Sequence, residues 1–567
     1  MVIRCPYPDI SIPEESILSY LFGSGEALPD DPLWINAADT TQYISLRTAL
    51  QWIKRLSIGL DRAGVKRNGV VMTVTPNHIF VPIALLGAVC SCRIFSGANP
   101  AYSVDEISYQ MRNTEAQVVL VHPSLLQTAR LAAKKAGLAD DKLLLFSDAQ
   151  HQPVDDIQDW FSILGSDEEA SNYSLPHLSG PEAKKQIATL NYSSGTTGLP
   201  KGVMITHSNL VSNVSQALYL SLLREEEQNV TQERWVGMLP LYHAFGQFNS
   251  IMLAIKLQVP VYIMTSFVYE DLLNLIQTRK ITELQLVPPI VVLLTKHPAT
   301  AKYDLSSVIK VSSGAAPLSQ SLANACASRF KTAVRQGWGM TELTCAGIFL
   351  PNGFSDETGS VGFLCPNSEV KLLDENGNEV GTGQRGEILI RGPQVSPGYW
   401  RNEKATRETM LEGGWLKTGD VAISDERGWF WIVDRLKVSK PIIIMWSNGT
   451  LTQPKELIKV SGFQVAPAEL EALLLTHPAI ADAGVVGIPD SFDAQERPRA
   501  YIQLKESGST TAEEIQAWIK TRVAKHKNLT GGVKFVEAVP KSAAGKIQRR
   551  VMKGWAKKDA QAGKPKL

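Results

Sequence analysis

Hydroxyl side chains, glycines and one lysine are concentrated in the stretch "LNYSSGTTGLPKGVMITHSNL", residues 190–210. Gly195 and Gly198 carry no side chain, so they leave backbone N–H groups open to an approaching ligand. These N–H groups, the neighbouring hydroxyls and the Lys201 ammonium are donors that phosphate oxygens accept. The hydroxyls belong to Ser193, Ser194, Thr196 and Thr197. The spacing differs from the Walker pattern GxxxxGK[ST]. The stretch predicts a phosphate-binding loop, and a Gly/Ser-rich surface linker is the alternative.

Alternating strands and helices are predicted on both sides of this loop. The run "IATLNYSS" has strand character and leads directly into it. Other β-rich apolar runs, each followed by an amphipathic helical stretch, lie at 69–76, 116–122, 259–264 and 283–289. Strand–helix alternation of this kind predicts α/β layers on largely parallel sheets.

The pattern of predicted secondary structure changes in the last third of the chain. Residues 360–435 read as short strands with Gly-rich turns, and a compact unit of helices and strands begins near residue 456. We therefore expect an α/β fold: a large N-terminal domain of layered α/β sheets plus a β-rich subdomain, followed by a small mobile α+β C-terminal domain. The expected boundaries are 1–434 for the large domain, 435–455 for a hinge and 456–567 for the small domain.

Composition excludes several classes of protein. At 567 residues the chain exceeds what one hydrophobic core usually spans. A net charge of +1 gives no basic excess for nucleic acid. Six cysteines without a CxxC pair or a His cluster favour free thiols over disulfides or a zinc site. The N-terminus lacks the apolar run of a signal peptide. Residues 80–98 are short for a membrane span and contain Arg93, so we expect a buried helix and strand there and no transmembrane segment.

The loop resembles that of the superfamily that makes acyl-adenylates, which includes acyl-CoA synthetases, firefly luciferase and peptide-synthetase adenylation domains. The resemblance recurs in order over roughly residues 40–550, and "SSGAAPL" and "VSGFQVAPAELE" look most like the 4-coumarate–CoA ligase branch. The segments that carry it are "LPLYHAFG" (239–246), "VSSGAAPL" (311–318), "RQGWGMTE" (335–342), "GWLKTGD" (414–420), "IVDRL" (432–436), "KVSGFQVAPAELE" (459–471) and "PKSAAGKIQRR" (540–550).

The resemblance implies a ligase that uses ATP, Mg²⁺ and coenzyme A. Attack of a carboxylate on the α-phosphorus of ATP turns its oxygen into part of AMP, a far better leaving group, and a thiol can then take the acyl group. The protein then has to position two anions and neutralise the developing charge.

The resemblance also assigns residues to the nucleotide. Thr341 is expected at the α-phosphate and Glu342 as a ligand of Mg²⁺. Trp338 stands where relatives usually carry a Tyr against adenine, and a buried core Trp is the alternative. Asp420 is expected at the ribose hydroxyls with Arg435 alongside, although "KTGD" by itself reads as a turn. The phosphate contacts are expected from Ser193, Ser194, Gly195, Thr196, Thr197 and Lys201, and further nucleotide contacts from Gln336 and Gly337.

Other residues are assigned to the acid and the thiol. His243 lies beside the expected acid tunnel, and a lone His is more often structural than a base. The remaining tunnel candidates are Phe245, Ala315, Ala316, Gly337 and Gly339, which suit an aryl or fatty acid. Coumarate-type relatives often have Tyr at the position of Phe245 and a cation at that of Ser266. Lys546 is the cation expected at the carboxylate and α-phosphate; a Lys-rich end is otherwise a solvated surface. After rotation of the small domain, Lys459, Ser461, Gly462 and Gln464 are expected at the tunnel mouth.

Residues 438–455 (18 residues) interrupt the family pattern, which would run from "DRLK" directly into "ELIK". The block is apolar in the middle, "PIIIMW", which is unusual for an exposed loop. It is either an inserted element or a retained intron, because Val438-Ser439 can be encoded by a splice-donor sequence and Leu451-Thr452 by a branch point.

Three functions remain open at this stage. An acid–CoA ligase is the first, an adenylating enzyme that loads a carrier protein is the second, and a nucleotide-binding protein inactivated by the block is the third. The chain ends in Pro-Lys-Leu, which approximates the S-K-L peroxisomal signal, so the expected location is cytoplasmic or peroxisomal. A basic tail that ends in Leu by chance is the alternative.

Overall fold

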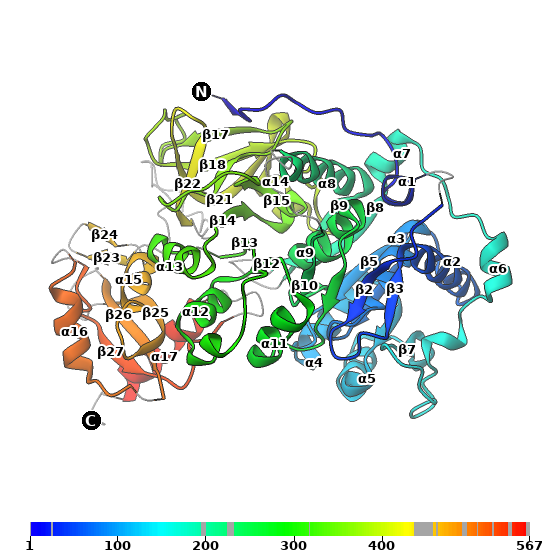
Figure 1. Cartoon of the computed structure of the whole chain (residues 1–567), viewed down its shortest axis with the longest axis horizontal. Coiled ribbons are helices and arrows are strands. Elements are labelled where there is room, and N and C mark those ends of the chain that lie inside the picture. Colours follow the sequence, from blue (N-terminus) through cyan, green and yellow to red (C-terminus); the bar gives the residue numbers. More distant parts are fainter. Residues whose placement is uncertain are drawn as a thin grey trace. The chain divides into compact units, whose positions relative to one another are not determined.

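The chain divides into two compact units (Figure 1). The first comprises Met1–Lys371, Leu389–Thr418 and Ser424–Trp431, and the second Leu372–Ile388, Gly419–Ile423 and Ile432–Leu567. The computed structural model describes residues 2–23, 27–193, 200–223, 232–316, 318–435, 458–460, 463–465, 467–489, 496–506, 508–523, 527–541 and 547–562.

The first unit contains a seven-stranded sheet in the order β19-β9-β8-β5-β4-β6-β7. Strands β8, β5, β4, β6 and β7 run parallel, whereas β9 is antiparallel to both β8 and β19. The strands are β4 (Val70–Val74), β5 (Ile94–Ala98), β6 (Ala116–Val121), β7 (Leu143–Leu145), β8 (Ile187–Ser193), β9 (Lys201–Thr206) and β19 (Gly398–Tyr399).

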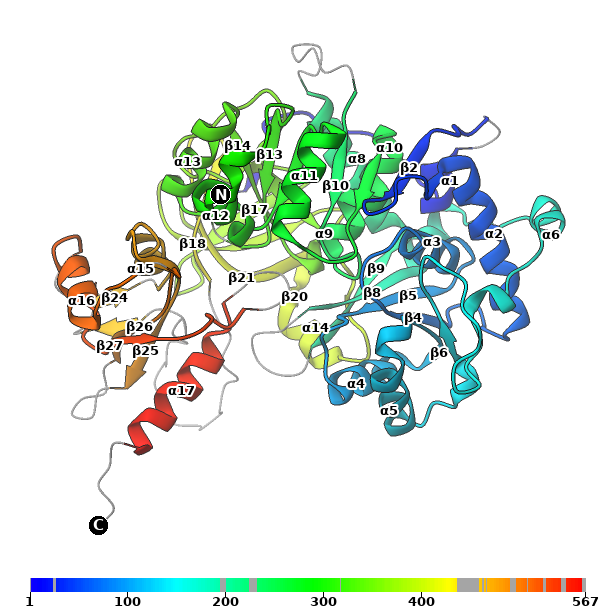
Figure 2. The same ribbon diagram turned by 60° about the horizontal axis from the view of Figure 1, so that its bottom comes forward.

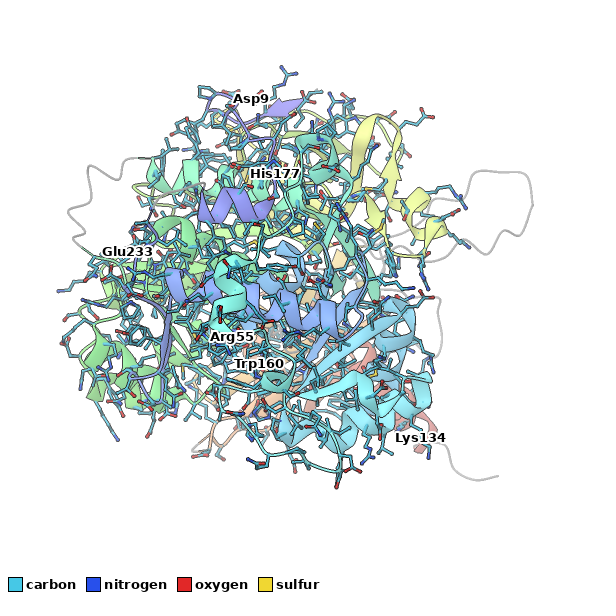
Figure 3. The ribbon with its side chains drawn as sticks, turned by 90° about the vertical axis from the view of Figure 1, so that its right-hand side faces the viewer. Asp9, Arg55, Lys134, Trp160, His177 and Glu233 are labelled. Carbon is cyan, nitrogen blue, oxygen red and sulfur yellow. The ribbon has the colours of Figure 1, made fainter. Side chains whose placement is uncertain are left out.

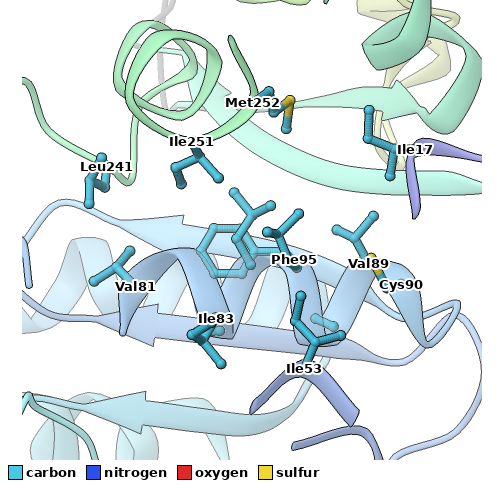
Figure 4. Close-up of a cluster of buried hydrophobic side chains, with 14 of the residues drawn as sticks. Ile17, Ile53, Val81, Ile83, Val89, Cys90, Phe95, Leu241, Ile251 and Met252 are labelled. Carbon is cyan, nitrogen blue, oxygen red and sulfur yellow. The ribbon is translucent and has the colours of Figure 1, made fainter. Parts of the chain in front are cut away.

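Helices cover both faces of this sheet, and Figure 2 shows α2 and α3 apart from α4 and α5. The alternation of β4 explains the two layers, because successive side chains of a strand point to opposite faces. Val71 joins the core of α2 (Leu46–Arg62) and α3 (Val81–Cys90), where Ile53, Ile83 and Phe95 pack together (Figure 4). Met72 and Val74 join the core of α4 (Val104–Thr114) and α5 (Leu126–Ala136).

Aromatic rings close the outer side of the α2–α3 layer. Trp160 lies 5.9 Å from Trp52 of α2 and 5.3 Å from Phe80, ring centroid to ring centroid. Figure 3 labels Trp160 together with Arg55, whose guanidinium lies over the Trp52 ring. The other helices of this part are α1 (Ile17–Phe22), α6 (Asp167–Asn172), α7 (Gly180–Lys185) and α8 (His207–Leu222).

A second sheet of the first unit is parallel from β14 through β13, β12, β10 and β11 to β2. These strands are β2 (Pro32–Asn36), β10 (Trp235–Gly237), β11 (Val261–Ile263), β12 (Glu283–Leu286), β13 (Lys310–Ser313) and β14 (Val334–Gly339). Antiparallel strands extend it, namely β3 (Tyr43–Ser45) beyond β2, and β15 (Ala346–Phe349) and β16 (Gly362–Leu364) beyond β14.

Helices pack on this second sheet through one apolar core. Their side chains meet those of β12 and β13, for example Leu272 and Val291 against Leu284 and Val311. The helices are α11 (Tyr269–Arg279), α12 (Pro288–Lys296) and α13 (Gln320–Phe330). A short helix, α9 (Ala244–Gly246), continues into a π-helix (Gln247–Leu253) and α10 (Ala254–Leu257).

Short strands follow, as the sequence predicts for residues 360–435. They are β17 (Glu369–Leu373), β18 (Gly386–Arg391), β20 (Met410–Leu411), β21 (Trp415–Ser424) and β22 (Trp429–Arg435), with α14 (Glu403–Thr409) among them. The N-terminal strand β1 (Ile3–Arg4) pairs antiparallel with β17.

The second unit has its own sheet and core. Strands β25 (Ile480–Pro489) and β26 (Glu496–Leu504) are antiparallel, and β27 (Gly532–Phe535) runs parallel to β26. A hairpin of β23 (Ile458–Val460) and β24 (Phe463–Val465) and the helices α15 (Pro467–Leu474), α16 (Ala512–Lys520) and α17 (Arg549–Ala562) complete it. Leu470, Val485, Ile502 and Ile515 share the core.

The expected α/β class is confirmed, including the β-rich stretch and a smaller α+β unit. The helix and strand expected at residues 80–98 are α3 and β5, both fully buried. All six cysteines are free. Over the described part of the chain, no helix has both the length and the apolar content to cross a bilayer.

Candidate active site

Glu342 is a buried carboxylate that accepts hydrogen bonds from two hydroxyl groups. Tyr399 Oη donates to Glu342 Oε1 at 2.8 Å, and Ser193 Oγ donates to the same oxygen at 3.4 Å. The other oxygen, Oε2, receives no hydrogen bond from any residue within the described ranges. One oxygen is thus held in place while the second stays open to a ligand.

Lys201 brings a positive charge to the same place. β8 ends at Ser193 and β9 begins at Lys201, and their antiparallel register pairs these two residues directly. The Lys201 ammonium lies 4.9 Å from the centroid of the Tyr399 ring, close enough for a cation–π interaction. No carboxylate among the described residues forms an ion pair with it, so its charge is available to an anion.

Glu342 is placed by the turn that follows β14. The turn is tight because a Cβ at Gly339 would lie 1.8 Å from the carbonyl oxygen of Cys345. A single 3₁₀ turn, Thr341–Leu343, follows, and the Ser396 N–H donates to the Glu342 carbonyl at 2.9 Å. The Thr341 hydroxyl makes no hydrogen bond to another described residue, although the residue is only 9% exposed. It is a second polar group with open capacity beside Glu342.

The predicted adenine residues also lie on β14. Gln336, Gly337 and Trp338 precede Gly339 on this strand, and Trp338 is buried. Its ring packs over Gly347, where a Cβ would lie 2.9 Å from a ring carbon. The side chain is therefore part of the packing between β14 and β15. Both interpretations of Trp338, a core residue and a residue that lies against adenine, remain open.

Among the predicted acid-binding residues, Phe245 lies next to the segment that carries Ala315 and Ala316. Its ring lies 3.3 Å from the point where a Cβ of Gly314 would be, directly before Ala315 and Ala316. Ala315 itself has a positive φ of 67°, so the backbone turns sharply there. His243 directly precedes α9 as its N-cap residue, and burial lowers the pKa of its imidazole, which keeps the ring neutral at pH 7. A neutral ring that no carboxylate of the described residues hydrogen-bonds fits a wall of the site better than a base.

Asp420, predicted to bind the ribose, belongs to the second unit. It lies on β21 and is buried, and the N–H of the preceding Gly419 donates to Glu387 at 3.2 Å. The remaining predicted residues lie outside the described residues or have side chains that do. They are Ser194, Gly195, Thr196, Thr197, Arg435, Lys459, Ser461, Gly462, Gln464 and Lys546.

Tyr399 is the functional candidate that sequence reasoning missed. It lies on the two-residue strand β19, where it pairs with Val203 of β9, and its only local signal is the sequence "SPGYW". Nothing in that signal points to Glu342, which is 57 residues away along the chain.

The open groups fit a nucleotide phosphate and a hard cation. Carboxylate oxygens are the ligands that Mg²⁺ prefers, and Oε2 of Glu342 is unused by the described residues. The Lys201 ammonium and the Thr341 hydroxyl, which have no ion-pair or hydrogen-bond partner among the described residues, complement phosphate oxygens.

Comparison with known proteins identifies the family. Residues 23–400 match the AMP-binding enzyme family, and residues 469–546 match the AMP-binding enzyme C-terminal domain. The block at 438–455 falls between the two matched ranges.

Named relatives align along most of the chain. A probable 4-coumarate–CoA ligase of Dictyostelium discoideum is 35% identical over 96% of both chains. A 4-coumarate-CoA ligase of Narcissus pseudonarcissus is 35% identical over 97% of this chain and 96% of the relative. A phenylacetyl-CoA ligase of Aspergillus niger is 32% identical over 96% and 97%.

Solved structures share the fold. The anthranilate CoA ligase crystallised with anthranoyl-AMP has a TM-score of 0.81 at 23% identity, and covers 97% of this chain and 99% of that one. ATP-bound MatB from Rhodopseudomonas palustris has a TM-score of 0.78 at 24% identity, over 96% and 99%. The chain therefore belongs to the AMP-binding enzyme family, in the 4-coumarate–CoA ligase-like branch of the acyl-adenylate-forming superfamily.

Proposed function

We propose that the chain is an AMP-forming acid–CoA ligase that joins an aryl or aliphatic carboxylic acid to coenzyme A. The observation that carries the proposal is the arrangement around Glu342. Ser193 and Tyr399 donate to one carboxylate oxygen, and no other described residue donates to the second oxygen. The Lys201 ammonium lies over the Tyr399 ring and forms no ion pair with a described carboxylate. The named relatives, which are CoA ligases over nearly their whole length, support the same reaction.

The reaction has two steps. In the first, a carboxylate oxygen of the acid attacks the α-phosphorus of ATP, and pyrophosphate leaves with the electron pair of the broken P–O bond. In the second, the sulfur of coenzyme A attacks the acyl carbon, its proton is lost to solvent, and AMP leaves. The chain's own groups have to hold the anions in line and offset their charge.

Residues of the first unit are assigned to ATP. Ser193 and Lys201 would bind phosphate oxygens together with Ser194, Gly195, Thr196 and Thr197, and Thr341 would donate to the α-phosphate. Trp338 would lie against adenine, with Gln336 and Gly337 beside it. Glu342 would hold Mg²⁺, which when bound offsets the negative charge of the phosphates.

Residues of the second unit are assigned to the ribose, the transferred phosphate and the thiol. Asp420 and Arg435 would bind the ribose hydroxyls, and Lys546 the carboxylate and α-phosphate. Lys459, Ser461, Gly462 and Gln464 would serve the thiol step. We keep the division into 1–434, 435–455 and 456–567 as part of this proposal.

The acid is of the aryl or aliphatic class. His243, Phe245, Ala315, Ala316, Gly337 and Gly339 supply apolar or small side chains and a neutral imidazole. Two relatives are named for 4-coumarate and one for phenylacetate, all of them aryl acids. Phe245 lacks the hydroxyl of a Tyr, so we expect acids without a para-hydroxyl to be used at least as well as 4-coumarate.

The test is pyrophosphate exchange with the full-length protein. Purified protein is given Mg-ATP, labelled pyrophosphate and a panel of aryl, aliphatic and amino acids, and formation of labelled ATP is measured. CoA-dependent AMP release is then followed with the acids that pass. Label in ATP with an aryl or aliphatic acid, followed by AMP release with CoA, supports the proposal. No exchange with any acid contradicts it.

The same assay distinguishes the two alternative functions, a carrier-protein acceptor and an inactive protein. Exchange without CoA-dependent AMP release would indicate a carrier-protein acceptor, and ATP binding without exchange would indicate an inactive nucleotide-binding protein. Peroxisomal import stays a sequence-based prediction, which a fusion of the last residues to a fluorescent protein would test.

A further inference from the structure

The helix α4 contacts the ends of three strands that carry the residues around Glu342. Tyr109 Oη donates to the carbonyl oxygen of Pro200 at 3.1 Å, at the entry to β9. Tyr192 Oη, at the end of β8, donates to Asn113 Oδ1. The indole N–H of Trp400, next to β19, donates to the Asn113 carbonyl at 3.0 Å.

Each of these contacts is one residue away from a side chain of the candidate site. Tyr192 precedes Ser193, Pro200 precedes Lys201, and Trp400 follows Tyr399. The first pair lies on β8, the second at the start of β9 and the third at β19. One helix therefore fixes the backbone beside Ser193 and Tyr399, which donate to Glu342, and beside Lys201, which lies over the Tyr399 ring.

The helix is suited to this role because both its start and its packing are fixed. Ser103 and Glu106 form a capping box at its N-terminus. Ile107 and Met111 are buried in the core with Met72 and Val74 of β4. Tyr109 and Asn113 are four residues apart, so they share one face of the helix.

The contacts on the Tyr109–Asn113 face of α4 also pack against one another. The rings of Tyr109 and Tyr192 meet edge to face, with centroids 6.4 Å apart. Burial raises the pKa of both phenols, so both hydroxyls are neutral donors at physiological pH. The backbone N–H of Trp400 donates to the Gly202 carbonyl at 2.7 Å. A Cβ on Gly202 would lie 3.2 Å from the Tyr192 ring. β9 and β19 are thus hydrogen-bonded to each other, and β9 packs closely against the Tyr192 ring.

We propose that Tyr109 and Asn113 are positioning residues for the ATP step, which hold Ser193, Lys201 and Tyr399 in register around Glu342. Neither touches the site itself; they act through Tyr192, Pro200 and Trp400. The inference rests on the proposed function, because it assigns Ser193 and Lys201 to the phosphates of ATP. It predicts that loosening α4 weakens the use of ATP and leaves the use of the acid nearly unchanged.

The test compares Tyr109→Phe, Asn113→Leu and Asn113→Asp in the full-length protein. Tyr109→Phe removes only the hydroxyl, and Asn113→Leu removes the acceptor while keeping the volume. Asn113→Asp keeps an acceptor oxygen for Tyr192. Tyr173→Phe is the matched control, because its hydroxyl donates to Asp61 on α2 at 2.9 Å, away from α4. Pyrophosphate exchange gives the KM for ATP, the KM for the acid and kcat, and thermal unfolding gives the midpoint.

We expect Tyr109→Phe and Asn113→Leu each to raise the KM for ATP about 3- to 10-fold, the loss of one hydrogen bond. The KM for the acid should stay within about 2-fold, since no acid-side contact changes. Asn113→Asp and Tyr173→Phe should resemble wild type. Combining Asn113→Leu with Tyr192→Phe should add little to the single variants, because both remove the same bond.

Two outcomes overturn the inference. Unchanged KM for ATP in both variants would show that α4 does not position the site. Equal losses in both KM values and kcat, with a lowered unfolding midpoint and no rescue by Asn113→Asp, would show a purely structural role. A wild-type protein without any exchange would instead contradict the proposed function.

Discussion

Glu342 shows how two neutral hydroxyls can prepare a carboxylate for a ligand. Tyr399 and Ser193 both donate to Oε1, so the carboxylate is oriented without loss of its charge. A carboxylate that instead paired with Lys201 would bind neither a cation nor a phosphate well. The Lys201 ammonium lies over the Tyr399 ring and forms no ion pair with Glu342 in the described part of the chain.

Replacing Glu342 by Gln tests the importance of its charge. Gln keeps an acceptor for Tyr399 but cannot neutralise a cation, so we expect kcat for pyrophosphate exchange to fall about 100-fold or more. The thermal midpoint should change little because the side chain keeps its size and its hydrogen bond. Glu403→Gln, at an exposed site on α14, is the control and should be silent. Exchange at the wild-type rate in Glu342→Gln would remove Glu342 from the site.

The tight turn at Gly339 connects the end of β14 to the residues Thr341 and Glu342 of the candidate site. A Cβ there would lie 1.8 Å from the Cys345 carbonyl oxygen, so Gly339→Ala forces β14 and β15 apart. We expect the free energy of unfolding to fall by about 1–3 kcal/mol, and exchange to fall further because Thr341 and Glu342 follow directly. Denaturant unfolding and exchange assays measure both.

Gly381→Ala is the matched control for that change, since nothing lies within 4 Å of the added methyl. It should leave both the stability and the exchange rate near wild type. A Gly339→Ala protein as stable as the Gly381→Ala protein would show that the β14–β15 turn adjusts freely.

At the scale of elements, local patterns predicted much of the fold. The apolar runs and amphipathic stretches correspond to β4, α3, β6, α5, β11, α11, β12 and α12 because a period of two or 3.6 residues is a local property. The antiparallel β8–β9 hairpin was not visible, since the Gly-rich stretch between its strands reads only as a loop. Tyr399 and Asn113 were missed because their partners lie 57 and 79 residues away. Spacing along the chain carries no information about such contacts.

For the whole molecule, two buried histidines make stability depend on pH. Burial lowers the pKa of His78 and His207 to about 3, and neither ring nitrogen of His78 has a hydrogen-bond partner in the described part of the chain. In the unfolded chain a His titrates near 6.5, so the unfolded state binds more protons between pH 6.5 and about 3. The free energy of unfolding therefore falls as pH falls through this window, by about 1.4 kcal/mol per pH unit for each ring.

His78→Leu tests this dependence, because it removes one of the two groups and keeps an apolar side chain against Phe146. We expect denaturant unfolding from pH 6.5 to 4.5 to show a shallower slope in this variant. His177→Leu, at an exposed position (Figure 3), should keep the wild-type slope. Parallel slopes in all three proteins would show that His78 does not stay neutral in the folded state.

We predict that the block at 438–455 impairs turnover, because it lies in the expected hinge. It lies where the resemblance places the hinge, and its structure is outside the described residues. Lengthening a loop costs only about 1 kcal/mol, so the two units should fold with or without it. Rotation of the small domain between two poses is more sensitive, because a hinge has to return to the same docked positions. We expect a deletion of 438–455 to raise CoA-dependent AMP release more than pyrophosphate exchange, with similar unfolding midpoints. Equal kinetics in the full-length and deleted proteins would show that the block is a tolerated insertion, and mature transcripts that all contain it would exclude a retained intron.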